Sequence, residues 1–516
     1  MLISGPAGSG KTRIINALRH FFVSKNEGSR LRVTSYMGIA ANNVSGITLH
    51  SVLNLTHADF ASKSIDELKY MWAGVDYLII DEISMISCEF LQTISVALGR
   101  ATGLTDIPFG GLNVIFAGDL AQLPPVGETR LSSYIDPSRG AGTERGQQRL
   151  KGKLLWLSVS TVVLLQKNNR QSGIENVRFV ELLTRLRDGN CNTSDYQLLL
   201  SRVVTAERNI LEWNLHPSKL IPIIVCNNST KDAINLAMAN SFAQKNNQRL
   251  ISFTSFDENN GMPLTDRSLL NIVDVLHSGK TSGRLKNLPL CLGMPVMVTT
   301  NIDVPGGIVN GSMGTIRSFD YKTLSNGEHI LNHCIVHIPT ATAAQMPGLG
   351  DHEYPIMPDT IYIRVRASKS KQMITIKRTQ VPLIHAFAIT AHKSQGQTID
   401  KAVVDLTACH GTEAPYVMLS RVRRLDDLLI LRAFPISKIR CRLSEDSRRE
   451  QTRIYFHHLT TMLRYGTPQE QELATTELAK QKKKNSQDEL DCAVISSLTD
   501  SLASKDSRLS KKRRIS

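Results

Sequence analysis

Gly5-Pro6-Ala7-Gly8-Ser9-Gly10-Lys11-Thr12 is the stretch of sequence that decides the fold. It fits the pattern G-x-x-x-x-G-K-[ST], with apolar Leu2-Ile3 before it and a helical pattern after it. Its glycines let backbone N–H groups close around phosphate oxygens, and the helix that follows adds the positive end of its dipole. We therefore predict a phosphate-binding loop in which Lys11 reaches the β- and γ-phosphates and Thr12 holds Mg²⁺. The order strand, loop, helix disfavours a chance Gly-rich turn.

The sequence around this loop alternates short apolar runs with amphipathic stretches up to about residue 165. The amphipathic stretches include residues 12–23 and 89–98. Continuous apolar runs of this length are typical of strands buried on both faces of a parallel sheet. They indicate a doubly wound α/β domain over residues 1–165. The runs are residues 31–34, 77–80, 113–116 and 162–165.

Two of these runs end in residues suited to nucleotide chemistry. The run at 77–80 leads directly into Asp81 and Glu82, and Gln122 follows the run at 113–116. Ligands bind at the carboxyl ends of parallel strands, so these side chains are expected beside the phosphate loop. We predict that Asp81 holds Mg²⁺, that Glu82 is the general base toward an attacking water, and that Gln122 bonds the γ-phosphate or that water.

The rest of the chain divides by its pattern of apolar runs. A second α/β domain is expected over residues 166–288 and 386–440. Residues 289–385 carry short runs separated by Gly, Pro and Asn, which predicts a small inserted β-barrel. Residues 441–484 are expected to form a mainly exposed helical extension, and 485–516 a disordered basic tail. The basic string at 511–514 is either a nuclear address or a solvated tail.

Composition limits the class of protein. A chain of 516 residues suggests about three domains, and a hydrophobic content of 41% fits a globular protein. A formal net charge of +15 favours a polyanionic partner, either nucleic acid or an anionic membrane face. The eight cysteines form no C-x-x-C pair, which argues against a zinc ribbon and for reduced thiols. No run reaches the roughly 20 apolar residues of a membrane span, and the start lacks the basic region of a signal peptide, so we expect an intracellular protein.

Further strings occur in an order that resembles superfamily one helicases, and most closely the PIF (petite integration frequency) family of DNA helicases. The resemblance runs from residue 1 to about 435. Beside the phosphate loop, Asp81-Glu82 and the string at 118–126, it is carried by residues 33–51, 166–171, 388–398 and 416–422.

The resemblance implies two RecA-like domains with ATP and Mg²⁺ bound between them. It assigns Arg170 and Arg421 to the γ-phosphate and adds Gly396 to the nucleotide-binding residues. On the residues alone, surface ion pairing is the favoured interpretation of each Arg. The resemblance also implies a monomeric motor that moves 5′-to-3′ on single-stranded and forked DNA, with roles in repair, recombination and telomere maintenance. The implied contacts to single-stranded DNA are Thr48, His50, Thr390, His392 and Lys393.

The sequence departs from the family in two places. Only four residues precede Gly5, whereas the family carries an adenine-recognition motif there, so we expect weakened adenine selectivity or a truncated protein. Tyr36-Met37 stands where the family usually has Pro-Thr, and the Tyr ring is a candidate for stacking. Residues 53–70 occupy the place of the family's strand-separating wedge. Some strings also resemble helicases of Helitron transposons. Two alternatives stay open: a DNA-binding ATPase remnant without unwinding activity, and a P-loop ATPase that remodels protein.

Overall fold

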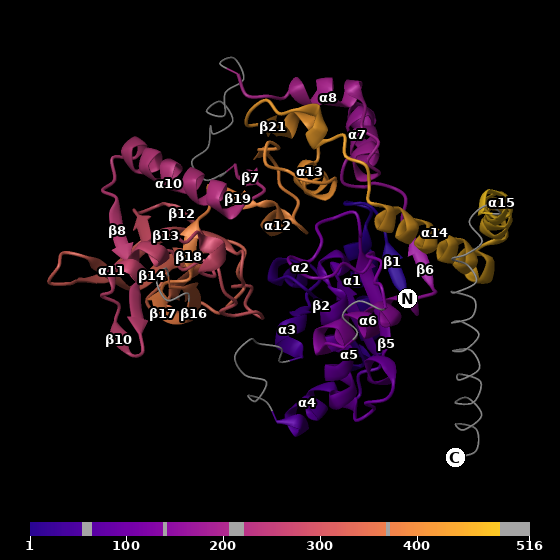
Figure 1. Ribbon diagram of the computed structural model, residues 1–516, viewed down its shortest axis with the longest axis horizontal. Helices are drawn as coiled ribbons and strands as arrows, with labels where there is room; N and C mark the ends of the chain where they lie inside the picture. The colour runs from indigo at the N-terminus through magenta and orange to yellow at the C-terminus, as the bar shows by residue number, and fades with distance from the viewer. Residues whose placement is uncertain (54–63, 138–141, 206–220, 368–371, 486–516) are drawn as a thin grey trace.

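The computed structural model describes residues 1–53, 64–137, 142–205, 221–367 and 372–485. In Figure 1, a first α/β domain lies below a second α/β domain, and a β-rich lobe lies to their left. The C-terminal helices return from the second domain to the first. This architecture confirms the predicted fold class. The predicted tail at 485–516, with its basic string, falls almost wholly outside the described residues, as does most of the predicted wedge.

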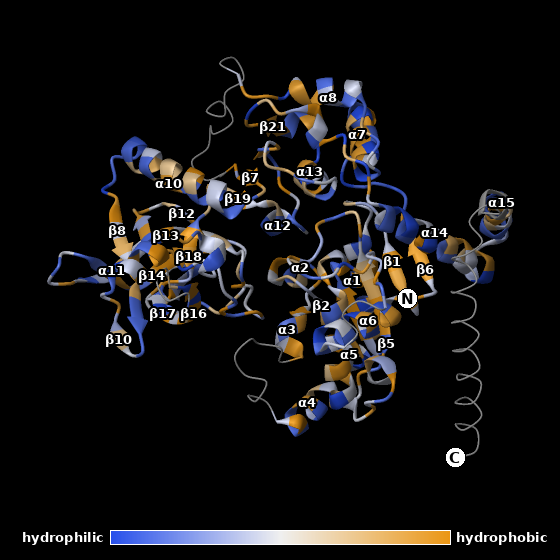
Figure 2. Ribbon diagram, in the orientation of Figure 1, coloured by the Kyte–Doolittle hydropathy of each residue, from blue (hydrophilic) through white to orange (hydrophobic). Residues whose placement is uncertain are grey.

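The first domain is built on a six-stranded parallel sheet of order β3-β2-β4-β5-β1-β6. The four predicted runs are β2, β4, β5 and β6. The strands of the sheet are rich in buried apolar residues. In Figure 2, β1 and β6 are coloured orange as hydrophobic segments. Because β5 pairs with both β1 and β4, the ends of these three strands meet at one edge of the sheet. The strands are β1 (Leu2–Ser4), β2 (Leu31–Ser35), β3 (Ile47–Thr48), β4 (Tyr77–Asp81), β5 (Asn113–Gly118) and β6 (Val162–Leu164).

Six α-helices belong to this domain in the described part of the chain. The helix α1 follows the phosphate loop directly, and α5 is capped by the Ser87 hydroxyl, which accepts a bond from Phe90 N–H at 2.9 Å. The helices are α1 (Lys11–Ser24), α2 (Gly38–Asn43), α3 (Leu49–Val52), α4 (Ile65–Trp72), α5 (Cys88–Thr102) and α6 (Glu144–Leu157).

The second domain has a four-stranded parallel sheet of order β19-β7-β20-β21. All four strands are buried, as expected for a sheet covered on both faces. The strands are β7 (Ile223–Val225), β19 (Ala388–Thr390), β20 (Ala402–Val404) and β21 (Leu428–Ile430). The helices are α7 (Val177–Arg187), α8 (Thr193–Leu200), α10 (Asn228–Lys245), α12 (Ala391–Ser394) and α13 (Glu413–Leu419).

The β-rich lobe is inserted between α10 and β19 of the second domain. One sheet has seven strands, in the order β11-β8-β14-β13-β12-β18 with β15 beside β14, and the other has the order β10-β9-β17-β16. The strands are β8 (Ile251–Thr254), β9 (Phe256–Asn259), β10 (Met262–Pro263), β11 (Asn287–Leu290), β12 (Pro295–Val298), β13 (Met313–Thr323), β14 (His329–His337), β15 (Glu353–Ile356), β16 (Asp359–Arg366), β17 (Met373–Gln380) and β18 (Leu383–His385), and one helix is α11 (Arg267–Asp274).

This lobe begins earlier in the chain than the expected start at residue 289. Its strands begin at Ile251, because β8 pairs with β11 and β14, and β9 pairs with β17. The early strands β9 and β10 are short and polar, so no apolar run marks them in the sequence. Residues 251–288 therefore belong with the lobe rather than with the second α/β domain.

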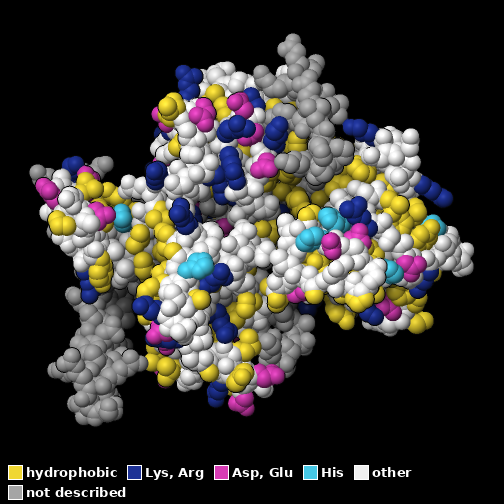
Figure 3. Space-filling view, turned by 180° about the vertical axis from the view of Figure 1, so that it is seen from behind, with side chains coloured by type: hydrophobic (Ala, Val, Ile, Leu, Met, Phe, Trp, Pro, Cys, Tyr) yellow, Lys and Arg dark blue, Asp and Glu magenta, His cyan; other side chains and the backbone are white. Residues whose placement is uncertain are grey.

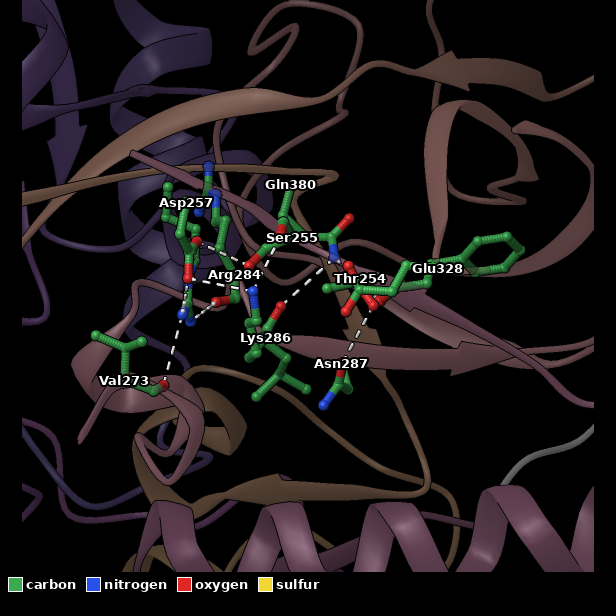
Figure 4. A network of polar contacts seen from close by, with 12 residues as sticks. Thr254, Ser255, Asp257, Val273, Arg284, Lys286, Asn287, Glu328 and Gln380 are labelled. Atoms are coloured by element: carbon green, nitrogen blue, oxygen red, sulfur yellow. Dashed lines mark hydrogen bonds and ion pairs between the residues drawn. The ribbon is translucent and has the colours of Figure 1, made fainter. Parts of the chain in front are cut away.

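A buried polar network ties the paired strands β9 and β17 of one sheet to the segment that leads into β11 of the other (Figure 4). Arg378 of β17 is fully buried and donates two hydrogen bonds to Asp257 of β9, at 2.8 and 2.7 Å. The same guanidinium donates to the carbonyl of Arg284 at 3.2 Å, and Lys286 lies 3.5 Å from Asp257. Burial alone would raise the pKa of Asp257, but the hydrogen bond and charge of Arg378 hold it below its usual value.

The C-terminal helices are α14 (Glu445–Tyr465) and α15 (Pro468–Asn485). Most of α14 is exposed or half-buried, as expected, but one face packs along the edge strand β6 (Figure 1). The N–H groups of Val162 and Leu164 donate to Thr461 Oγ1 and His458 Nδ1, at 2.9 and 3.3 Å. Side chains of α14 thus satisfy backbone groups that an edge strand leaves open. Among the described helices, none combines the length and apolarity needed to span a bilayer.

Candidate active site

An open cleft of about 1350 Å³ lies between the two α/β domains. The phosphate loop, the end of β4 and the loop after β5 contribute from the first domain. The segment after β6, the loop after α12 and the end of α13 contribute from the other side. The predicted residues that line it are Gly8, Ser9, Gly10, Lys11, Thr12, Asp81, Glu82, Gln122, Arg170, Gly396 and Arg421.

The phosphate loop has the geometry of an anion cradle. Gly8 and Gly10 have φ of 81° and 96°, a left-handed conformation that side chains disfavour. Lys11 Nζ donates to the carbonyls of Gly5 and Pro6, at 2.8 and 3.0 Å, at the base of the loop. Burial lowers the pKa of Lys11, although Asp119 and the two carboxylates of β4 oppose this effect. Ser9 Oγ is buried and has no hydrogen-bond partner among the described residues, so the loop holds a free donor where phosphate oxygens would bind.

The carboxylates at the end of β4 fit a divalent cation. Burial and the neighbouring charge of Glu82 raise the pKa of Asp81 to about 7. A cation would relieve that unfavourable environment, and carboxylate and hydroxyl oxygens are ligands that Mg²⁺ accepts. Asp81 Oδ1 accepts the backbone N–H of Glu82 at 2.9 Å. Glu82 itself has φ 57° and ψ 47°, and such strain at a non-glycine residue is typical of functional sites.

The two predicted arginines lie close together in the cleft. Arg170 donates to the carbonyl of Ser420 at 2.8 Å. Arg421 is 1% exposed, and its guanidinium donates within the second domain, including to Val417 O at 2.6 Å and Gln397 O at 3.2 Å. Burial, and after it the charge of Arg170, lowers the pKa of Arg421 to about 9. Two crowded cations facing the phosphate loop fit a polyanionic ligand such as a nucleoside triphosphate.

The segment before Arg170 lies directly on the phosphate loop. Asn169 N donates to Gly8 O at 2.8 Å, and the Asn169 side chain donates to Ser9 O at 3.3 Å. A Cβ built on Gly8 would lie 2.5 Å from Arg170 Cβ, so only glycine allows this approach. The loop and the predicted arginine are therefore held in register by backbone contacts.

The predicted DNA contacts fall in two groups, one in each α/β domain. In the first domain, Thr48 is buried and its hydroxyl caps α3 by accepting Ser51 N–H at 3.4 Å. His50 is stacked on Phe90, with ring centroids 4.9 Å apart, and Tyr36 contacts both rings edge-on. Ring packing therefore fixes the imidazole in place.

The second group lies at α12 of the second domain. Thr390 precedes the helix, and burial lowers the pKa of His392. Lys393 Nζ donates to Asn310 of the lobe, and burial together with Lys231 lowers the pKa of Lys393 to about 8. A Cβ on Gly38 would lie 3.1 Å from Oδ1 of Asn301, which belongs to the same loop of the lobe as Asn310. The loop 301–311 thus touches α12 and the start of α2.

Sequence reasoning missed three functional candidates at the domain boundary. Asp119 is fully buried at the end of β5, and Arg187 of α7 and Tyr416 of α13 both bond to it. Gln395 reaches Glu82 across the cleft. Asp119, Gln395 and Tyr416 stand inside strings that carried the family resemblance, but nothing in the strings shows that they meet.

A phosphate loop and acidic residues on one parallel sheet, faced by arginines across a cleft from a second parallel sheet, define a P-loop nucleoside triphosphatase with two RecA-like domains. Residues 1–197 match the family of PIF1-like helicases. The chain is 26% identical to the ATP-dependent DNA helicase PIF1 of Xenopus laevis, over 84% of this chain and 58% of the relative. The N-terminal part of the chain is therefore similar to PIF1-like helicases.

Two further similarities extend over a larger share of the matched protein. Uncharacterized protein 030L of Invertebrate iridescent virus 6 is 26% identical, over 83% of this chain and 87% of that protein. The crystal structure of Pif1 helicase from Bacteroides in complex with ADP-AlF3 and single-stranded DNA has a TM-score of 0.62 at 23% identity, covering 88% of this chain and 92% of that chain. This last similarity supports the fold. The chain spans less than two thirds of the length of the named PIF1 helicases, such as 65% of the Psychrobacter protein.

Proposed function

We propose that this protein is an ATP- and Mg²⁺-dependent DNA helicase that moves along single-stranded DNA. The observation that carries the proposal is the cleft, where Lys11, the carboxylates of β4 and two arginines meet from opposite domains. The curated relatives from Xenopus and Psychrobacter are named ATP-dependent DNA helicases, which supports the same activity.

The chain's residues divide the chemistry of hydrolysis between them. The loop N–H groups, Ser9 and Lys11 bind the phosphates, and Glu82 takes a proton from the attacking water. Thr12 and Asp81 would hold Mg²⁺, which would supply positive charge to the phosphate oxygens. Gln122 orients the water or the γ-phosphate, and Gly396 lets the second domain approach, since a Cβ there would lie 3.3 Å from Glu82 Oε1.

Arg170 and Arg421 stabilise the charge that develops on the transferred phosphoryl group. Arginines in this role are worth roughly 10³–10⁵ in rate. Because they come from beyond β6, hydrolysis depends on closure of the two domains. A cycle of closing and opening then becomes a step along DNA.

The DNA path proposed here runs past His50 of the first domain and Lys393 of the second. Seen from behind, Lys and Arg side chains run down from the second domain toward the first (Figure 3). Such a face supplies salt-dependent affinity for phosphates without base specificity. The direction of movement, 5′-to-3′, and roles in repair, recombination and telomere maintenance are part of the proposal, as are the Helitron-type origin and a nuclear location directed by residues 511–514.

The test measures ATP hydrolysis with and without single-stranded DNA, beside a Lys11→Ala variant. Strong stimulation that is lost in Lys11→Ala, followed by unwinding of a forked duplex, supports the helicase. An ATP hydrolysis rate that is the same with and without DNA favours a P-loop ATPase with another substrate. DNA binding without stimulated hydrolysis favours the DNA-binding remnant.

A further inference from the structure

Tyr416 links the phosphate loop of one domain to the other domain through its hydroxyl. The backbone N–H of Ala7 donates to Tyr416 Oη at 2.8 Å, and Tyr416 Oη donates to Asp119 Oδ2 at 3.3 Å. The Tyr416 side chain is 2% exposed and Ala7 is 5% exposed, so water does not compete for these bonds. One hydroxyl from the second domain therefore serves the phosphate loop as acceptor and the end of β5 as donor.

Asp119 is fixed by further contacts that also cross the domain boundary. Arg187, the last residue of α7, donates to both Asp119 oxygens, at 2.9 and 3.3 Å, and Ala121 N–H donates at 3.2 Å. Burial alone would raise the pKa of Asp119, but the charge and hydrogen bond of Arg187 lower it, so the group stays an acceptor. Burial, and then Asp119, raises the pKa of Tyr416, so its hydroxyl stays a donor.

The helix that contains Tyr416 ends two residues before Arg421 and so determines its position. Tyr416 lies in α13 (Glu413–Leu419), and Arg421 follows two residues after its end and bonds back to Val417 O. Beside Tyr416, Glu413 forms an ion pair with Arg130 of the first domain at 2.5 Å. The position of α13 against the phosphate loop thus sets where Arg421 lies in the cleft.

We propose that Tyr416 is a positioning residue that locks α13, and with it Arg421, onto the phosphate loop when the two domains close. This inference rests on the proposed ATPase function and deepens it. Removing the hydroxyl leaves the Ala7 N–H and one Asp119 lone pair unmatched only in the closed form, because the open form exposes both to water. The closed form is therefore weakened, while the binding surface for nucleotide stays intact.

The experiment compares Tyr416→Phe with Tyr196→Phe in the full chain. Tyr196 also lies in the second domain, and its hydroxyl donates to Phe434 O at 2.7 Å, away from the phosphate loop. We expect Tyr416→Phe to lower kcat for ATP about tenfold, which equals about 1.4 kcal/mol of barrier, with KM for ATP and affinity for a fluorescent ADP changed less than twofold. Tyr196→Phe should change neither kcat nor KM by more than twofold.

Hydrogen exchange gives a readout that does not depend on activity. Amides of residues 5–12 should exchange faster in Tyr416→Phe and unchanged in Tyr196→Phe. Equal exchange in both variants, or equal kcat, overturns the proposal. If the wild type hydrolyses ATP without response to DNA, the helicase function fails while the comparison of kcat and exchange still decides the role of Tyr416. If it hydrolyses none, exchange alone decides.

Discussion

Gln395 Nε2 donates a hydrogen bond to Glu82 Oε2 at 2.8 Å and a second one to Ser84 Oγ at 3.2 Å, across the boundary between the two domains. Gln395 is 1% exposed and Glu82 is 9% exposed. The bond fixes the orientation of the proposed general base, whose left-handed backbone would otherwise be strained without compensation. Since Gln395 follows α12, which carries Lys393, the proposed DNA contact and the proposed nucleotide site of the second domain are two residues apart.

Replacing Glu82 by Gln should abolish hydrolysis while nucleotide stays bound. The amide keeps the shape of the side chain but cannot take a proton, and a general base contributes roughly 10²–10⁴ in rate. ATP turnover and fluorescent-nucleotide binding are measured side by side. Glu27→Gln, an exposed acid near the far end of α1, is the matched control. A Glu82→Gln variant that hydrolyses ATP within threefold of wild type would show that another group is the base.

The affinity for single-stranded DNA should fall as the pH rises past about 8. Lys393 has a pKa lowered to about 8 by burial and by Lys231, so its ammonium is lost near that pH in the free protein. A neutral amine no longer attracts phosphate, so the contribution of Lys393 to DNA affinity is fully present below pH 8 and is lost above it. Fluorescence anisotropy between pH 7 and 9 at fixed ionic strength measures this. Lys393→Arg, which stays charged, should flatten the curve; an unchanged slope would remove Lys393 from the DNA site.

The buried pair Asp257–Arg378 should matter far more to the lobe than an exposed pair on the same strands. Arg378→Met leaves the carboxylate of Asp257 buried without its main partner, which typically costs about 3–5 kcal/mol. Lys377→Met removes the neighbouring pair with Glu258, whose lysine side chain is 43% exposed, and should cost below about 1 kcal/mol. Hydrogen exchange of β9 and β17 in both variants reports the difference. Equal protection would mean that the sheets hold together without this network.

The parts of the fold that the sequence predicts are those with local signals. The phosphate loop needs glycines at fixed spacing, and β4 is an apolar run that ends in Asp81-Glu82, so both are visible in a few consecutive residues. The strand β9 was missed because its inward residue is Asp257, a charge compensated mainly by Arg378 of the paired strand β17, which lies 121 residues away in the sequence. The hydrogen-bonded cluster of Asp119, Arg187 and Tyr416 was also missed, because its three residues come from elements that are far apart in the sequence.

The helix α14 shows the same effect and leads to the last prediction. Its buried face includes the polar residues Glu450 and His458, so the hydropathy pattern of the sequence does not indicate that α14 packs against the first domain. Glu450 accepts the indole N–H of the fully buried Trp156 at 2.8 Å. Burial, and then Arg453, lowers the pKa of His457 to about 4, and burial also lowers the pKa of His458.

Docking of α14 on β6 should therefore weaken on mild acidification. A histidine whose folded pKa lies below its unfolded value of about 6.5 favours the docked state fully above that pH. The stabilisation is lost as the pH falls from about 6.5 toward 4, because the undocked helix takes up protons first. Partial solvent screening limits the contribution of His457 to about 1 kcal/mol. Hydrogen exchange of residues 445–465 between pH 5 and 7.5, corrected for intrinsic rates, should show protection falling with acid in the wild type. In the double variant His457→Gln and His458→Gln, protection should not change with pH. A pH dependence that persists would assign the effect to the carboxylates instead.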